Sequence, residues 1–288
     1  MIDNYRKGKI LLSEERFSKL VLSLGENRQK YFINHIIKKE GNWGQIIGGI
    51  KAYKINKKYF EEGRKKGARS RNEFGVKYYF DINMPLSEEL CEFVGVIIGD
   101  GCTNKYGHMY QTQIAGDKRL DREYYSSHFV SICKTLFGIT PKIIIRPSGM
   151  YVNLYSKRVF ELLTGRFKIP AGVKCYTIEI PQEIMDSPNQ MLKFTLRGMF
   201  NTDGGVGIDK RKAYKRPYIR VNYTSASPKL IEQIRSFLNE SQIFHSVHDI
   251  NNFRAKQIQI NGSQNVKLFL KQIGFSNPRH LNKVRDLL

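Results

Sequence analysis

The chain has 288 residues and a formal net charge of +22, because 48 Lys and Arg residues stand against 26 Asp and Glu residues. A charge of this size predicts a polyanionic partner, with nucleic acid as the first candidate and an anionic membrane surface as the second. The basic residues are interleaved with Tyr, Phe, Asn and Gln and are not gathered into one amphipathic helix, which favours nucleic acid. No apolar stretch reaches the ~18 residues of a membrane span, so a membrane partner is not expected.

Segment 1–17 lacks the apolar core of a secretory signal, and the cysteines form no Cys-x-x-Cys pair. These features predict reduced thiols and an intracellular protein, in the cytoplasm or nucleoid, with an organelle left open as an alternative. The hydrophobic share of 41% is enough for a buried core. The cysteines in question are Cys91, Cys102, Cys133 and Cys175.

Residues 1–85 differ from the rest of the chain, since they hold 19 Lys and Arg against 9 Asp and Glu. Helical periodicity runs through residues 17–39. The glycines of residues 41–49 and the Lys/Arg run after them predict a turn followed by a solvated basic stretch. Two interpretations of this mainly helical extension stay open: a helix-turn-helix DNA reader, or a basic arm that only contacts phosphates.

From residue 86 onward the chain shows one plan twice, in residues 86–186 and 187–288. The expected order in each copy is helix, two strands, helix, two strands, helix. This predicts an α/β (α+β) fold with two αββαββα repeats in pseudo-two-fold symmetry. The later strands and helices are expected at 106–114, 121–138, 142–146, 150–156 and 157–165 in the first copy, and at 218–225, 227–241, 246–250, 255–260 and 263–274 in the second.

Each copy begins with an apolar run that ends in an aspartate and glycine, FVGVIIGDG at 93–101 and LRGMFNTDGG at 196–205. Asp100 and Asp203 align at an offset of 103 residues. Each aspartate follows the last turn of a predicted helix, where the helix dipole disfavours a carboxylate. An aspartate stands at this unfavourable place in both copies, at the same position of the motif. The repetition indicates that the two positions form a functional site. Carboxylates beside free helix carbonyls suit a hard divalent cation.

The two motifs, together with the repeated order around them, resemble the single-chain, two-motif LAGLIDADG homing endonucleases. The resemblance covers roughly residues 86–288. It implies a monomeric, metal-dependent enzyme that cuts a long, asymmetric double-stranded DNA site and leaves short 3′ overhangs. It also implies a DNA-binding saddle built from the strands of both repeats.

The resemblance further implies that the two motif helices pack through small residues one turn apart, Gly95 and Gly99 in the first and Gly198 and Thr202 in the second. This packing would bring Asp100 and Asp203 together, where they would hold Mg²⁺, with Mn²⁺ as a substitute. The expected metal site consists of Asp100, Asp203, Gly99 and Thr202.

In this family a lysine late in each repeat lies near the attacking water, and Lys174 and Lys283 fit these two positions. With 48 basic residues in the chain, a lysine that only faces solvent is the alternative in each case. Some relatives carry a Gln-Lys pair after the first strands; this chain has Asp117-Lys118 in one repeat and Ala226-Ser227 in the other. The two half-sites are therefore expected to cut unequally.

Polar and apolar residues alternate along the predicted strands, so each strand has one polar face. Arg suits guanine, and Asn or Gln suits adenine, in the major groove. The alternative is the wet side of a half-exposed sheet, which needs polar residues in any case. The expected DNA-contacting residues are Gln111, Gln113, Lys118, Arg146, Arg220, Asn222, Gln257 and Gln259.

Two other functions stay open on the same fold: an RNA maturase that binds intron RNA, and a DNA-binding regulator that does not cleave. The presence of both aspartates counts against each, since neither role needs a carboxylate at the end of a helix. The chain ends in Arg-Asp-Leu-Leu and begins with Met1, and so lacks the terminal residues of a self-splicing intein. We therefore expect a free-standing, intron-encoded product.

Overall fold

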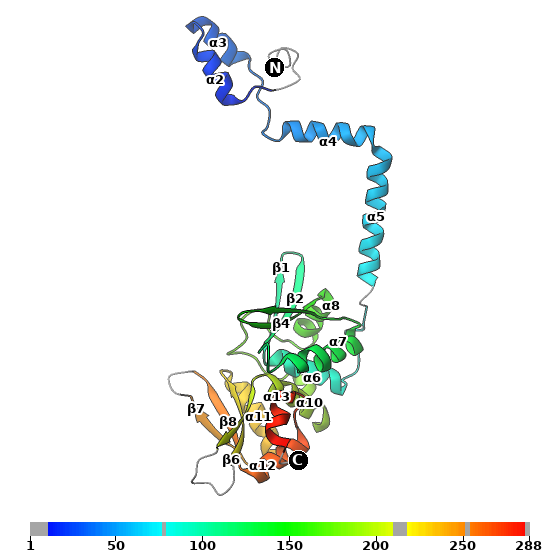
Figure 1. Cartoon of the computed structure of the whole chain (residues 1–288), viewed down its shortest axis with the longest axis vertical. Coiled ribbons are helices and arrows are strands. Elements are labelled where there is room, and N and C mark those ends of the chain that lie inside the picture. Colours follow the sequence, from blue (N-terminus) through cyan, green and yellow to red (C-terminus); the bar gives the residue numbers. More distant parts are fainter. Residues whose placement is uncertain (1–10, 77–78, 210–217, 251–253, 286–288) are drawn as a thin grey trace. The chain divides into compact units, whose positions relative to one another are not determined.

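The computed structural model describes residues 11–76, 79–209, 218–250 and 254–285 (Figure 1). The chain divides into two compact units, residues 1–71 and 72–288. Within the described ranges, no helix combines the length and the apolar character needed to cross a membrane.

The first unit is helical and has almost no core. Between residues 11 and 69, Val21 is the one buried residue. Glycines 44, 48 and 49 lie inside a helix, although the sequence predicts a turn there, and a Cβ on any of them would meet nothing within 4 Å. The helices are α2 (Glu14–Leu22), α3 (Glu26–His35), α4 (Trp43–Ile55) and α5 (Lys57–Val76).

The second unit contains the predicted order of elements twice, which confirms the αββαββα repeats. The first repeat consists of α6 (Glu88–Ile98), β1 (Gly101–Tyr106), β2 (Met109–Gly116), a π-helical turn (Tyr124–Phe129) continuing into α7 (Val130–Phe137), β3 (Lys142–Arg146), β4 (Gly149–Tyr155) and α8 (Lys157–Glu161), which continues into a second π-helical turn (Leu162–Arg166). The short α9 (Gln182–Met185) links the repeats. The second repeat consists of α10 (Asn189–Thr202), β5 (Gly204–Asp209), β6 (Tyr218–Ser225), α11 (Pro228–Glu240), β7 (Ser246–Asp249), β8 (Lys256–Asn261), α12 (Ser263–Gln272) and α13 (Pro278–Val284).

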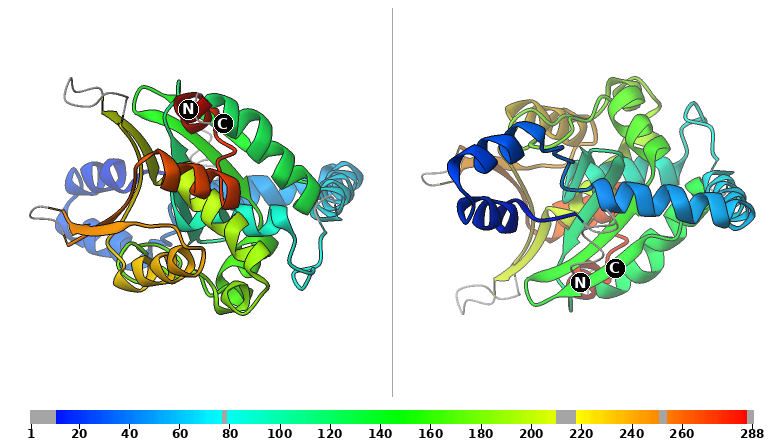
Figure 2. Two further views of the ribbon diagram at one scale, coloured as in Figure 1. Left: turned by 90° about the horizontal axis from the view of Figure 1, so that it is seen from below. Right: turned by 90° about the horizontal axis from the view of Figure 1, so that it is seen from above.

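Each repeat forms one four-stranded antiparallel sheet, in the order β1-β2-β4-β3 or β5-β6-β8-β7. One face of each sheet packs against helices, which gather beside the strands in the two end-on views of Figure 2. Along β6 the apolar side chains of Ile219, Val221 and Tyr223 are buried, and the polar side chains between them are half-buried. The period of two predicted for this strand is therefore observed.

The motif helices α6 and α10 pack against each other at the centre of the second unit. A Cβ on Gly95 would lie 2.0 Å from the carbonyl oxygen of Thr195, and one on Gly198 would lie 2.3 Å from that of Glu92. Only glycine allows the two backbones to approach this closely. Every residue of α6 from Leu90 to Ile98 is buried, so this helix pair holds both repeats around one core.

Candidate functional site

Asp100 and Asp203 meet where the paired motif helices end. The residue after α6 is its cap, Gly99, whereas α10 is capped by Asp203 itself. The two carboxyl groups are close enough to share a hydrogen bond. The close packing of α6 and α10 therefore converts two positions 103 residues apart into one acidic pair.

The surroundings of Asp100 and Asp203 disfavour the charged form of both carboxyl groups. Burial, followed by the nearby carboxylates of Asp203 and Asp121, raises the pKa of Asp100 to about 7. Burial also raises the pKa of Asp203, although this side chain reaches solvent, and the charge of Lys174 opposes that rise. Two carboxylates held together in this way attract a cation.

The glycines on either side of the aspartates have a steric role. A Cβ on Gly99 would lie 2.0 Å from Oγ1 of Thr202, which donates to the Met199 carbonyl at 2.9 Å. After the aspartates, a Cβ on Gly101 would lie 2.6 Å from Cα of Ile97, and one on Gly204 would lie 2.2 Å from the carbonyl oxygen of Phe200. Each strand can therefore begin directly beneath its own helix.

Lys174 approaches the end of α6 from the loop that follows the first repeat. Its Nζ donates to the carbonyl oxygen of Gly99 at 2.7 Å and to that of Ile98. Burial lowers the pKa of this ammonium, and the charges of Asp203 and Asp100 oppose that shift. The structure thus brings Lys174 into the electrostatic environment of both aspartates.

An open pocket of about 520 Å³ adjoins Lys174 and is lined by both repeats. Gly99 and Asp203 contribute to its wall, as do the start of β1 and the end of β6. The exposed thiols Cys102 and Cys175 also line it. The pocket therefore gives solvent access to Asp203 of the acidic pair.

Lys283 lies elsewhere. It belongs to α13, and its Nζ donates to the carbonyl oxygen of Val206 in β5 at 3.1 Å. The largest charge effects on the two aspartates come from their mutual interaction, Asp121 and Lys174. The structure therefore does not show Lys283 in an arrangement that matches that of Lys174.

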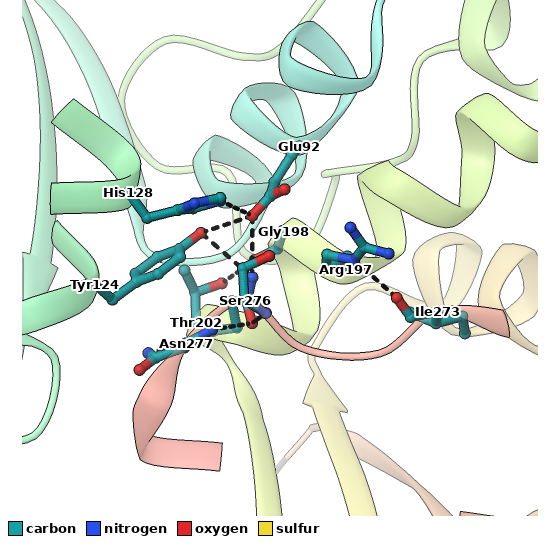
Figure 3. A network of polar contacts seen from close by, with 10 residues as sticks. Glu92, Tyr124, His128, Arg197, Gly198, Thr202, Ile273, Ser276 and Asn277 are labelled. Atoms are coloured by element: carbon teal, nitrogen blue, oxygen red, sulfur yellow. Dashed lines mark hydrogen bonds and ion pairs between the residues drawn. The ribbon is translucent and has the colours of Figure 1, made fainter. Parts of the chain in front are cut away.

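A buried polar network that was not predicted from the sequence connects the two repeats (Figure 3). Glu92 Oε1 in α6 accepts from Tyr124 Oη at 3.3 Å and from Asn201 Nδ2 at 3.2 Å, and lies 2.9 Å from His128 Nε2. Asn201 Oδ1 in turn accepts from the backbone N–H of Asn277 at 3.1 Å. The available signal in the sequence was Glu92 itself, a glutamate within the apolar part of α6. A buried carboxylate requires hydrogen-bond partners, so its position could have predicted a polar network.

The predicted DNA-contacting residues of the first repeat lie on or beside one sheet face. Gln111 and Gln113 both donate to Oδ1 of Asn153 at 2.7 Å, so this buried asparagine orients them. Lys118 donates to the carbonyl oxygen of Pro147 at 3.2 Å, and the guanidinium of Arg146 lies 5.6 Å from the ring centre of Tyr151. Asn153 was not predicted from the sequence, where a polar residue between the apolar Val152 and Leu154 of β4 is the available signal.

The second repeat carries a different set on the equivalent face. Arg220 pairs with Asp209 at 3.5 Å, and Asn222 packs over Gly205, where a Cβ would lie 2.4 Å from its Oδ1. Gln259 donates to Gln257 at 2.6 Å, and Gln257 donates to Oγ1 of the adjacent strand's Thr224 at 3.1 Å. These side chains form a continuous polar strip across β6 and β8.

The donors present fit Mg²⁺ better than a softer metal. Among the described residues, no group of three or more His, Cys, Asp or Glu side chains could hold a metal ion. Two carboxylates and helix-end carbonyls leave most of a coordination shell to water or phosphate, as Mg²⁺ prefers. Of the expected ligands, the Gly99 carbonyl already accepts from Lys174, and the Thr202 hydroxyl bonds within its own helix.

The comparisons with known proteins agree with this architecture. Residues 191–274 match the model of the LAGLIDADG-like domain. The structure of mesophilic variants of the homing endonuclease I-DmoI is similar to this chain with a TM-score of 0.51 and 15% identity, over 70% of this chain and 98% of that one. I-DmoI in complex with DNA and Mn gives a TM-score of 0.48 and 16% identity, over 66% of this chain and 98% of that one. Residues 191–274 thus resemble a LAGLIDADG-like domain, and the second unit has the fold of a LAGLIDADG homing endonuclease.

Two curated relatives come from Methanocaldococcus jannaschii. The replication factor C small subunit is 30% identical over 210 residues, covering 70% of this chain and 10% of that protein. The probable translation initiation factor IF-2 is 25% identical over 221 residues, covering 72% of this chain and 17% of that protein. The chain thus spans between a tenth and a fifth of the length of these relatives.

Proposed function

We propose that this chain is a site-specific, monomeric endonuclease that hydrolyses both strands of a long, asymmetric DNA duplex. The observation that carries the proposal is the meeting of Asp100 and Asp203 at the ends of two packed helices, with Lys174 beside them. A structural role would not require two carboxylates to be held together against their mutual repulsion. A nuclease does require it, because the pair can hold a cation against a phosphate.

In this proposal Asp100 and Asp203 bind Mg²⁺, which Mn²⁺ can replace, with the backbone at Gly99 and Thr202 completing the protein's share of the shell. The bound cation would lower the pKa of a water molecule and stabilise the charge that develops on the leaving oxygen. Lys174 supplies a positive charge close to the reacting phosphate. The packing of α6 against α10 orients the two carboxylates.

The polar faces of the two sheets would contact base edges in the major groove. The side chains assigned to this role are Gln111, Gln113, Lys118, Arg146, Arg220, Asn222, Gln257 and Gln259. Some of these side chains are already oriented by neighbouring residues: Asn153 accepts hydrogen bonds from both Gln111 and Gln113. Pre-oriented amides lose less entropy on contact with a base and so support specificity.

The N-terminal unit would lengthen the contact with DNA. Its helices expose many lysines and arginines and bury little, so a polyanion is a suitable partner for it. Whether it acts as a helix-turn-helix reader or as a basic arm is decided by the extent of the bound sequence: a reader adds conserved base pairs beyond the core site, and an arm adds only affinity.

The experiment that tests the function is selection from a randomised duplex library with Mg²⁺, with the bound and cut fractions sequenced separately. A cut fraction that converges on one long site supports the endonuclease. A bound fraction without cleavage contradicts it in favour of a DNA-binding regulator. Failure to enrich any duplex, combined with binding of a structured intron RNA, would favour a maturase.

A further inference from the structure

The loop that follows each repeat returns to the end of that repeat's motif helix. In the first repeat, Lys174 Nζ donates to the carbonyl oxygen of Ile98. In the second, Asn277 Nδ2 donates to the carbonyl oxygen of Asn201 at 3.1 Å. Ile98 and Asn201 are equivalent, because each lies two residues before its motif aspartate. Asn277 therefore occupies the position that corresponds to Lys174.

The backbone supports this equivalence independently of the side chains. The carbonyl oxygen of Lys174 accepts from the N–H groups of Thr177 and Ile178 at 3.0 and 2.8 Å. The carbonyl oxygen of Asn277 accepts from the N–H groups of His280 and Leu281 at 3.0 and 3.1 Å. Both loops thus make the same turn at the same offset of 103 residues from Lys174 to Asn277. Lys283 lies six residues beyond Asn277 and contacts β5 instead.

The two equivalent positions have opposite surroundings. Lys174 lines the pocket that also contains Asp203. Asn277 is completely buried, and its amide also donates to Asp121 Oδ1 at 3.0 Å (Figure 3 labels Asn277 in this loop). The nearby guanidinium of Arg279 pairs with Asp121 at 3.2 Å, so its charge is offset by a carboxylate. One half-site therefore has a lysine with access to the pocket, and the other has a neutral amide.

We infer that this substitution makes the two half-sites unequal, so that the strand whose scissile phosphate lies at Lys174 is cut first and a nicked duplex accumulates. This inference rests on the proposed endonuclease function. A cation beside the reacting phosphate stabilises the charge of the transition state, and the half-site at Asn277 lacks that contribution. Asn277 is thus the specificity-determining residue for the order of strand cleavage.

The test is a single-turnover time course on the duplex recovered from the cut fraction, with a different fluorophore on each strand. We expect the wild-type protein to cut one strand about 100- to 1000-fold faster than the other, in line with the loss of one charged stabiliser. Lys174→Asn should slow the faster strand by a similar factor and leave the slower strand unchanged. Asn277→Lys should accelerate the slower strand.

The double variant Lys174→Asn with Asn277→Lys gives the sharpest result, because reversal of the strand order cannot arise from partial unfolding. Lys267→Asn, at an exposed lysine of α12, is the matched control for the loss of one positive charge and should leave the ratio of the two rates unchanged. Equal rates for both strands in the wild-type protein would overturn the inference while leaving the endonuclease intact. Equal slowing of both strands by Lys174→Asn would also overturn it. If the wild-type protein cuts neither strand, the endonuclease proposal itself fails.

Discussion

The two repeats of this protein have one backbone plan and two different surfaces. The residue after each motif aspartate pairs in the same register, Gly101 opposite Ile114 and Gly204 opposite Tyr223. The polar faces nevertheless differ, because β1 carries Cys102 where β5 carries a glycine that makes room for an asparagine. The shared backbone fixes the acidic pair, whereas the strands and loops are free to diverge.

The difference between the two sheet faces bears on the symmetry of the proposed DNA site. Two identical faces would contact a palindromic site, and two unlike faces suit an asymmetric one. The same freedom allowed Asn277 to occupy the position that matches Lys174.

The largest effect is expected at the acidic pair, where the repeats should be equivalent. Asp100→Asn combined with Asp203→Asn should reduce cleavage at least about a thousandfold, because the metal site loses both carboxylates. DNA binding should persist, since it depends on the sheet faces. Cleavage of the selected duplex and its electrophoretic mobility shift measure the two properties. Undiminished cleavage by the double variant would sink the proposed mechanism.

The next effect concerns the helix pair, where both repeats contribute a glycine. Gly95→Ala and Gly198→Ala should each destabilise the second unit by about 1–3 kcal/mol, because the added Cβ would collide with a backbone carbonyl of the facing helix. Urea denaturation followed by circular dichroism measures this change. Gly165→Ala is the control, since its Cβ would meet nothing within 4 Å. Full stability of both helix variants would contradict the close approach of α6 and α10.

A smaller effect should appear in the dependence of stability on pH. The folded-state pKa of Asp100 is about 7, above its ordinary value of 3.8, so the folded protein binds more protons between these two pH values. Asp100 therefore reduces stability progressively as the pH rises from about 4 to about 7. Thermal unfolding without metal should show this decline, and Asp100→Asn should flatten it.

Mg²⁺ should oppose this decline. Above pH ~7 both carboxylates are available to the cation, and binding to the folded state alone raises Tm. A gain of about 1–2 kcal/mol corresponds to a rise of about 2–8 °C for a unit of this size. The rise should be larger at pH ~8 than at pH ~5.5 and should be absent in Asp100→Asn with Asp203→Asn. An equal rise in the double variant would place the bound cation elsewhere.

The smallest effect is expected at one sheet face only. Asn153→Ala removes the acceptor that orients Gln111 and Gln113. It should relax base preference in the first half-site by about 1–3 kcal/mol per affected base pair and leave the second half-site unchanged. Repeated selection with the variant measures both halves at once. A loss of preference spread over both halves would indicate a general effect on folding.

Sequence alone determined the repeats and their acidic pair, because both depend on local patterns. The periods of helix and strand, the glycine that follows each aspartate and the constant offset of 103 residues are all properties of short segments. The packing of α6 against α10 is then strongly limited, because the two helices can approach closely only where Gly95 and Gly198 lie. The prediction that Asp100 and Asp203 meet follows from these local facts and the family resemblance.

Only the tertiary structure decided which residues surround that pair. Lys174 and Lys283 fit the expected positions equally well by sequence, yet the loops that return to the helix ends bring Lys174 and Asn277 to equivalent places. The network around Glu92 joins residues more than a hundred positions apart. A long-range side-chain contact leaves no periodic trace in the sequence, because it depends on the path of the intervening chain and not on its neighbours.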